Sequence, residues 1–459
     1  MLTGMLDQKA LTELVDDGDI DTVLVCFTDL QGRLIGKRVT GHFFCEEVLD
    51  RGGAIEACVY LLAVDVDMTP LAGYAFANWS TGYGDFRCVP DFATLRVIPW
   101  LEKTALVLCD LLDDATGEPV EVSPRRILQR QLERAAALGY QVKTGSELEF
   151  FLFRESYDEA EAVDFSGLTP HSSVIEDYHI FQTTRDEYLI RQIRNGLDGA
   201  GIPVEFSKGE AGKGQHEINL RYADALTMAD RHVIYKNAAK EIAAANGRSL
   251  TFMAKYSMDE VGSSCHIHSS LWNADGTTSL MWHDDAPDHL SPAFRGWLGG
   301  LVATGRELAW MFAPTVNSYK RYQPESWAPT ALAWGRDNRT CGFRLVGHGQ
   351  GFRVESRIPG ADANIYLAFA ATIAAGLHGI ERGIDPPPIL VGNAYEAPDI
   401  PHVPWTLVDA IAEFERSEVA DAAFGTTVHA HLVNTAKQEW AAFNRAVTDW
   451  ERRRNFVQF

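Results

Sequence analysis

The chain of 459 residues is long enough for two or three domains around a large core, and its composition (46% hydrophobic, 23% charged) is typical of a globular protein. Its 63 acidic and 41 basic residues give a formal net charge of −22, which repels nucleic-acid phosphates and anionic lipid. We therefore expect no nucleic-acid partner and no membrane partner.

The N-terminus is acidic and lacks the basic start and apolar core of a signal peptide. No apolar run approaches the roughly 20 residues of a membrane span. The seven cysteines are scattered and form no C-x-x-C pair. These features predict reduced thiols in a cytoplasmic protein.

The first part of the chain predicts a small mixed domain. A short helix is expected over 11–18, two strands over 21–39 with a turn at Gln31–Gly32, and further strands over 93–100 and 104–112. A helix follows over 123–140, with Ser123 as N-cap, Pro124 at the first helical position and Gly139 as the stop. We place the domain boundary between these parts, giving domains of residues 1–115 and 116–459.

The second domain predicts an irregular alternation of elements, which favours an α+β fold over a doubly wound sheet. Strands are expected over 142–153, 215–222, 249–256, 264–272 and 352–358, and helices over 229–247 and 365–383. Residues 155–180 and 385–405 predict surface loops, and 436–456 predicts a single closing helix.

The strand over 142–153 contains Glu147 and Glu149 in an otherwise mostly apolar run. Residues two apart share one face of a strand and lie about 6.6 Å apart. Two negative charges at that distance repel by about 2–3 kcal/mol at an effective dielectric of about 20. An edge strand with hydrated glutamates is one explanation. A pair of divalent cations is the other, since hard oxygen ligands suit Mg²⁺ or Mn²⁺.

Three other segments offer similar groups. Glu210 and Glu217 bracket a glycine-rich turn, His266 and His268 share one face of a strand, and Glu355 lies in a further strand. Each segment alone is weak evidence. Together with the paired glutamates they supply five carboxylates and an imidazole, enough for two metals with open positions for substrate.

A cationic segment follows: Lys320, Arg321, Arg336, Arg339, Arg344, Arg353 and Arg357. In so acidic a chain this local surplus indicates a site for phosphate and carboxylate groups, with surface ion pairing as the alternative. Two metals facing arginines are the equipment of phosphoryl transfer from a nucleotide. The chain has neither G-x-x-x-x-G-K-[ST] nor a credible G-x-G-x-x-G, so another scaffold must hold the nucleotide.

The motifs resemble the glutamine synthetase superfamily over nearly the whole chain. They occur in that family's order: ELEFFLF, EAGKGQHE, SSCHIH, NSYKR, AWGRDNRTCGFR, VESRIPGADANIYLAFAA and VTDWER. The resemblance implies an N-terminal β-grasp domain, a C-terminal catalytic α+β domain, ATP and Mg²⁺ (or Mn²⁺). It also implies active sites between adjacent subunits of a hexameric ring, in a homo-oligomer expected to be a dodecamer of two rings.

The resemblance also implies roles for individual residues. Metal ligands would be Glu149, Glu210 and Glu217 on the glutamate side, and Glu147, His266 and Glu355 on the ATP side. Nucleotide contacts would be Glu205, Tyr222, His268, Ser270 and Arg353, with Arg339 and Arg344 on the phosphates. Glutamate would lie beside Gly262, His266, Arg321 and Arg357. The residues around Tyr395 do not match the family's adenylylation site, so we expect no such modification.

The chain departs from the ammonium-using members where the amine would bind. The flap motif GYEAP reads ESWAP here, which puts Glu325 at the glycine and Trp327 at the carboxylate. Glu56 stands for the ammonium-binding aspartate, and Val261 replaces an asparagine near glutamate. We count Glu56, Glu325 and Trp327, with Arg339, as the catalytic candidates.

Exchanging a flap carboxylate for a large aromatic removes an acceptor for NH₄⁺ and adds an apolar wall. This favours a γ-glutamylamide ligase that joins glutamate to a small organic amine, most like the glutamate–ethanolamine type. A polyamine ligase, an ordinary glutamine synthetase and a flap change without consequence are the alternatives. A catalytically inactive relative is disfavoured, because all six expected metal ligands are present.

Overall fold

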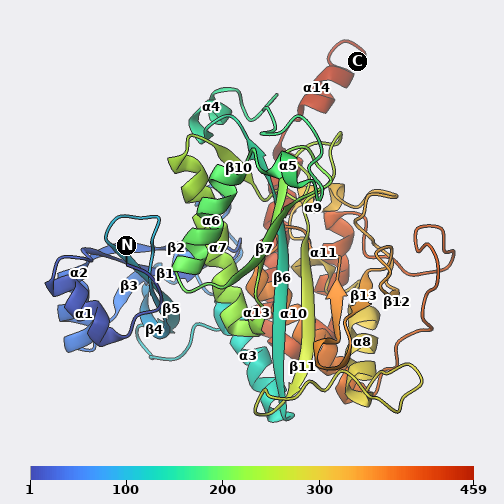
Figure 1. The fold of residues 1–459 in the computed structure, drawn as a ribbon, viewed down its shortest axis with the longest axis horizontal. Helices are drawn as coiled ribbons and strands as arrows, with labels where there is room; N and C mark the ends of the chain where they lie inside the picture. The colour runs from blue at the N-terminus through green and yellow to red at the C-terminus, as the bar shows by residue number, and fades with distance from the viewer. Residues whose placement is uncertain (1) are drawn as a thin grey trace.

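The computed structural model describes residues 2–459, which contain two β-sheets flanked by helices (Figure 1). The first sheet has five strands in the order β2-β1-β5-β4-β3. The second has nine, with the path β12-β13-β14-β11-β6-β8-β7 and with β9 and β10 also paired to β6. Both sheets mix with helices, which confirms the predicted α+β, glutamine synthetase-like class.

The first sheet occupies the N-terminal part of the chain. Its elements are α1 (Gln8–Asp16), β1 (Thr22–Thr28), β2 (Leu34–Thr40), α2 (Gly41–Phe43), the π-helical turn Phe44–Asp50, β3 (Ile55–Cys58), the 3₁₀ turn Val59–Leu62, β4 (Asp85–Val97) and β5 (Thr104–Asp113). β1 and β5 pair in parallel at its centre, and the other neighbours are antiparallel. The predicted boundary after residue 115 falls between β5 and the next helix and stays a prediction.

The second sheet and its helices occupy the rest of the chain. The elements up to its long central strands are α3 (Pro124–Ala137), β6 (Tyr140–Phe153), α4 (Tyr157–Ala162), α5 (Ile180–Thr183), α6 (Glu187–Gly199), β7 (Val204–Gly209), β8 (Gln215–Leu220), β9 (Ala223–Asp224), α7 (Ala225–Ala245), β10 (Ser249–Thr251) and β11 (Cys265–Asn273). The remainder comprises α8 (Pro292–Thr304), the 3₁₀ turn Ala309–Met311, α9 (Val316–Lys320), β12 (Trp334–Arg336), β13 (Phe343–Val346), the 3₁₀ turn Gly349–Gly351, β14 (Arg353–Ser356), α10 (Ile365–Arg382), α11 (Leu407–Glu415), α12 (Glu418–Phe424), α13 (Thr426–Arg445) and α14 (Asp449–Asn455).

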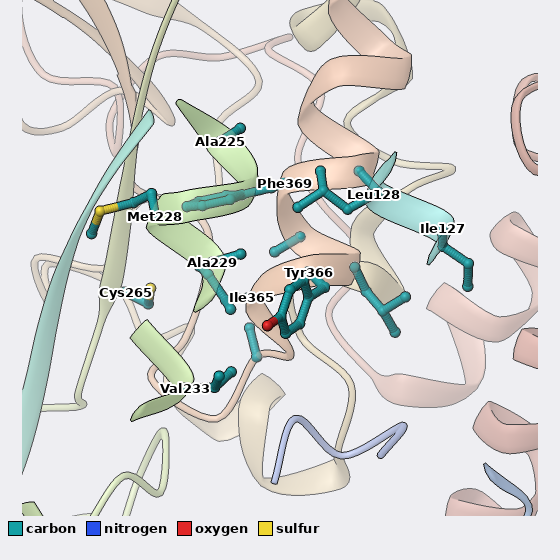
Figure 2. Close-up of a cluster of buried hydrophobic side chains, with 14 of the residues drawn as sticks. Ile127, Leu128, Ala225, Met228, Ala229, Val233, Cys265, Ile365, Tyr366 and Phe369 are labelled. Atoms are coloured by element: carbon teal, nitrogen blue, oxygen red, sulfur yellow. The ribbon is translucent and has the colours of Figure 1, made fainter. Parts of the chain in front are cut away.

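Strand β6 lies at the centre of the second sheet and gives it two unlike faces. Even-numbered residues such as Leu148 and Phe150 are fully buried and belong to the hydrophobic core. On this face β11 contributes Cys265, which Figure 2 shows beside the core side chains of α7 and α10, with α3 beyond them. The odd-numbered residues of β6, including Glu147 and Glu149, therefore face away from the helices.

Most predicted elements are confirmed. Helix α3 begins at Pro124, and Gly139 adopts a φ of 83° just beyond its end, the left-handed conformation that glycine tolerates. Ser123 holds the N-cap position but makes no side-chain capping bond. The strand predicted over 249–256 is shorter, since only Ser249–Thr251 pairs with β6. Residues 385–405 form no helix or strand, as predicted.

Two predictions were wrong. The single closing helix over 436–456 is two helices, because Ala446 is extended and Thr448 starts a new one in a capping box with Glu451. The loop over 155–180 contains a helical turn, α4, for the same reason: Ser156 and Glu159 form a capping box. None of the helices within residues 2–459 is long and apolar enough to cross a membrane, and all seven cysteines are free thiols.

The two sheets are linked by an ion cluster around the buried Arg125 of α3. Its guanidinium lies 2.6 Å from Asp91 on β4, 2.5 Å from Asp110 on β5 and 3.0 Å from Asp230 on α7. Asp230 also accepts a 2.6 Å hydrogen bond from the hydroxyl of Tyr366, which lies in the core of Figure 2. The side chains of Arg125 and Asp230 are each 4% exposed, so water does not replace a lost partner.

Replacing Arg125 with Met should destabilise the protein by about 3–5 kcal/mol, because Asp230 is then a buried charge without its cation. The measurement is urea unfolding at fixed protein concentration. Arg134→Met on the same helix is the matched control, since its contact with Glu381 is longer at 3.3 Å and more exposed. Equal unfolding midpoints for the two variants would contradict this role.

Candidate active site

Strand pairing gathers the predicted metal ligands on one face of the nine-stranded sheet. Residues directly opposite one another in antiparallel strands point to the same side. The register places Glu147 opposite His266, Glu149 opposite Glu217, and His268 opposite Glu355. Five carboxylates and two imidazoles, counting Glu210 at the end of β7, therefore converge from strands that are distant in sequence.

The first cluster is Glu149, Glu210 and Glu217, whose carboxylate oxygens lie within 4.8 Å of one another. Glu149 is 7% exposed and accepts a 2.7 Å hydrogen bond from the Ser264 amide. Burial and the charge of Glu210 raise the pKa of Glu149 to about 8, and the same two causes raise the pKa of Glu217. Three crowded buried carboxylates fit a divalent cation, which is the predicted glutamate-side set.

The second cluster surrounds Glu147. One oxygen of Glu147 accepts from His268 Nε2 at 2.8 Å, and the other lies 3.3 Å from His266 Nδ1. Burial would raise the pKa of Glu147, but these two hydrogen bonds outweigh it and hold the pKa well below its usual range. Within the described residues, His266 Nε2 is buried with no hydrogen-bond partner, a free imidazole nitrogen suited to a metal.

The ligand sets around Glu147 include both imidazoles. Groups within 4.8 Å are Glu147 with His268 and Glu355, and Glu147 with Glu217 and His266. The sequence had placed His266 with Glu355 and His268 on the nucleotide. β14 pairs His268 directly opposite Glu355, but His266 Nδ1 also lies 3.8 Å from a Glu355 oxygen, so the structure does not contradict the predicted grouping. Which imidazole completes the ATP-side set stays a prediction.

Glu355 is fully buried among arginines. One carboxylate oxygen accepts from Arg344 at 2.7 Å, and the other forms an ion pair with Arg357. Burial would raise the pKa of Glu355, but its electrostatic interactions with His266 and Arg357 lower it to about 2. Glu355 is therefore charged, and it also holds the two arginines in place.

Two cavities meet at this face of the sheet. The larger has a volume of about 810 Å³ and the smaller about 300 Å³. They share Glu147, Phe206 and Asn219 in their walls. Glu147 thus stands at the junction, where it can face a ligand in either cavity.

The predicted ligand-binding residues separate between the two cavities. The predicted nucleotide contacts Glu205, Tyr222, His268, Ser270 and Arg353 all line the smaller cavity. The larger is lined by Glu149, Glu210, Glu217, Gly262, His266, Arg321, Trp327, Arg339, Arg344 and Arg357. This separation matches a nucleotide on one side of Glu147 and its acceptor on the other.

The predicted glutamate-binding residues offer free donors. Arg321 is 1% exposed and donates to Ile358 O and Ser264 Oγ at 2.8 Å each. Within the described residues, the Nε groups of Arg321 and Arg357 are buried and make no hydrogen bond. A Cβ on Gly262 would come within 2.6 Å of Arg321 Cγ and 2.7 Å of Ala254 O, so only glycine fits there.

Two predicted residues lie outside both cavities of the chain. Glu56 lies on β3 opposite Arg87, exposed in the N-terminal sheet. Glu325 is exposed in the turn that carries Trp327 into the cavity wall. Glu325 and Trp327 have φ values of 55° and 60°. The resemblance expects glycine at the position of Glu325, and glycine adopts such a left-handed conformation readily. The roles of Glu325 and Trp327, like that of Glu56, stay predictions.

Among the residues of the larger cavity that were missed from the sequence are Asp177, Tyr178 and Lys208. Asp177 and Tyr178 belong to the segment predicted as a surface loop. Lys208 lies on β7, and no motif marks its position. No spacing or motif distinguished them, because the contact between the segment and β7 is tertiary. The isolated backbone pairing of Asp177 with Gly209 creates it.

The sheet, its paired carboxylates and the two cavities define the class: a catalytic fold of the glutamine synthetase type. The family model for the glutamine synthetase catalytic domain matches residues 121–455. The chain therefore belongs to the glutamine synthetase family.

Similar proteins cover nearly the whole chain. A gamma-glutamylethanolamide synthetase of Streptomyces coelicolor is 51% identical over 99% of this chain and 96% of its own length. A glutamate–isopropylamine ligase of a Pseudomonas species is 36% identical over 96% of this chain and 95% of its own length. A solved ADP complex of the protein GmaS, 30% identical, superposes with a TM-score of 0.83 over 97% of this chain and 99% of its own.

Replacing Glu147 with Gln should weaken Mn²⁺ binding by roughly tenfold or more, since the amide retains the volume but loses the anionic ligand. Folding should be preserved, because no core side chain is removed. Calorimetric Mn²⁺ titration measures the effect. Glu155→Gln, a change at a half-buried position two residues beyond β6, is the control with the same loss of charge. Equal affinities in the two variants would remove Glu147 from the metal site.

Proposed function

We propose that this protein joins the γ-carboxylate of glutamate to a small organic amine, with hydrolysis of ATP to ADP and phosphate. The observation that carries the proposal is the position of Glu147, between a small cavity lined by the predicted nucleotide contacts and a large cavity with buried arginines. The names of the similar ligases support it, and ethanolamine is the best candidate amine.

The clusters described above supply the proposed metal sites. Glu149, Glu210 and Glu217 would hold one Mg²⁺ or Mn²⁺, and Glu147 with Glu355 and His266 or His268 the other. Divalent cations bound there would offset the negative charges of the γ-phosphate and the attacking carboxylate. The fit rests on the unpaired His266 nitrogen and on the uncompensated Glu149 and Glu217.

The chain's own residues would perform the remaining steps. Arg321 and Arg357 present free Nε donors beside Gly262, which suits the carboxylates of glutamate. Arg339 and Arg344 line the same cavity and would stabilise the phosphate as the γ-glutamyl phosphate forms. The amine then attacks this acyl phosphate, releases phosphate and loses a proton. Glu56 of a neighbouring subunit is the proposed acceptor of that proton.

The proposed assembly is a homo-oligomer, a dodecamer of two hexameric rings as the family resemblance implies. Glu56 supports it, since it lies outside both cavities of its own chain. Helix α14 also supports it, because it extends from the body of the molecule (Figure 1) and its Trp450 is 66% exposed. A cytoplasmic location is proposed from the seven free thiols, six of them buried.

The alternatives are a γ-glutamylpolyamine synthetase, a glutamine synthetase that uses ammonium and an inactive relative. Phosphate release from ATP, Mg²⁺ and glutamate should be measured with ammonium, ethanolamine, isopropylamine, putrescine and spermidine. We expect the highest kcat/KM with ethanolamine or another small monoamine. Preference for ammonium would establish a glutamine synthetase, and preference for spermidine a polyamine ligase. If no amine stimulates phosphate release, the protein is a catalytically inactive relative.

Replacing Trp327 with Glu should shift preference towards ammonium and other small cations, because it returns a carboxylate to the flap and removes an apolar wall. The measurement is the ratio of kcat/KM for ammonium to that for ethanolamine, which we expect to rise by roughly tenfold. Trp405→Glu, an equally drastic change at an exposed tryptophan remote from the cavity, is the control. An unaltered ratio in Trp327→Glu would show that the flap does not select the amine.

A further inference from the structure

A cation belonging to the chain itself lies in the larger cavity. The ammonium group of Lys208 forms an ion pair with Glu210, lies 3.6 Å from Asp177 Oδ1 and stands 4.6 Å from the centre of the Tyr178 ring. The Lys208 side chain is only 17% exposed. Two carboxylates and an aromatic face are the groups by which proteins bind an alkylammonium ion. Lys208 therefore fills a ready-made site for one.

The backbone holds this site in place. Asp177 pairs in parallel with Gly209, which lays the loop segment along β7 next to Lys208. Gly209 permits the close approach, since a Cβ there would come within 2.7 Å of Glu176 Cβ. Glu176 is fully buried beneath the segment, 3.4 Å from His216 Nε2. The carboxylate and ring that contact Lys208 are thus parts of an anchored segment.

The cavity has no other carboxylate to offer. The acidic side chains in its wall are Glu147, Glu149, Asp177, Glu210 and Glu217. Four of them are the proposed metal ligands, which leaves Asp177 as the single spare carboxylate among the described lining residues, and Lys208 already pairs with it. The rest of the wall consists of cations such as Arg339, apolar surface such as Trp327, and uncharged polar side chains such as Asn219.

We propose that Lys208 is a specificity-determining residue that excludes amines bearing a second positive charge and so defines the substrate class as monoamines with an uncharged tail. The inference rests on the proposed function. The distal ammonium of a diamine would meet the Lys208 charge and find no free carboxylate in the part of the wall that this chain supplies. A hydroxyl or methyl group at the same place brings no charge, so the cavity accepts it.

A matched pair of amines isolates this effect. Putrescine and 1-aminopentane have the same number of non-hydrogen atoms and differ in one end, ammonium against methyl. The readout is the ratio of their kcat/KM values in phosphate release, which cancels changes that affect both amines equally. We expect the wild type to prefer aminopentane. In Lys208→Gln the ratio should move towards putrescine by roughly tenfold or more, because two cations about 7 Å apart no longer repel.

Two control variants are needed: one keeps the positive charge at position 208, and the other removes a positive charge at another position. Lys208→Arg retains the cation, and Lys213→Gln removes one at the exposed hairpin tip, where Lys213 lies 3.8 Å from Glu260. Neither should move the ratio.

The inference is overturned if Lys208→Gln keeps its activity with an unchanged ratio, or if the wild type already prefers putrescine. It is equally overturned if Lys208→Gln loses activity with both amines while Lys208→Arg does not, since the charge then serves the reaction itself. A wild type that is active with no organic amine defeats the proposed function instead, before any variant is made.

Discussion

Buried negative charge on one face of the nine-stranded sheet is the constraint on which the rest of this structure depends. Three carboxylates there, Glu149, Glu217 and Glu355, are almost fully buried. Glu355 is compensated by two arginines, and Glu147 at the junction by two histidines. Glu149 and Glu217 have no such partners, and their pKa values rise as a result. The cluster of Glu149, Glu210 and Glu217 is therefore the place on this face that fits a divalent cation.

The sheet tolerates this charge because its other face is secured by the core. Leu148 and Phe150 alternate with the glutamates of β6 and lie in the hydrophobic core, on a strand that packs against α3 and α7. A slip of one residue in the pairing of β6 would turn its glutamates into that core. Because such a slip would bury charged side chains in the core, only one register is stable. That register determines which proposed metal ligands lie opposite one another on neighbouring strands. Metal geometry and core packing are thus consequences of the same alternation.

This alternation also explains what the sequence could predict. Period-two patterning identified β6 and the shared face of Glu147 and Glu149, and capping residues identified α3. Pairing between strands leaves no local signal, so the sequence could not show that His268 lies directly opposite Glu355. The break at Ala446 was missed because a helical pattern continued across it. Asp177 and Lys208 were missed because they meet only through a long-range backbone pairing.

The site residues that could be predicted from the sequence differ from the others in where they lie in the fold. The proposed metal ligands lie on or at the ends of strands whose positions are over-determined by pairing and packing, as phosphoryl transfer requires. Two of the residues proposed to act on the amine lie outside the regular elements: Trp327 is one of two left-handed residues in its turn, and Asp177 lies in a loop segment that pairs with Gly209. Loops of this kind can change without disturbing the sheet. A family that keeps one phosphoryl-transfer site can therefore vary its amine through a few such residues. Lys208 adds a second route, because a substitution on β7 can change the charge of the cavity without any change in the backbone.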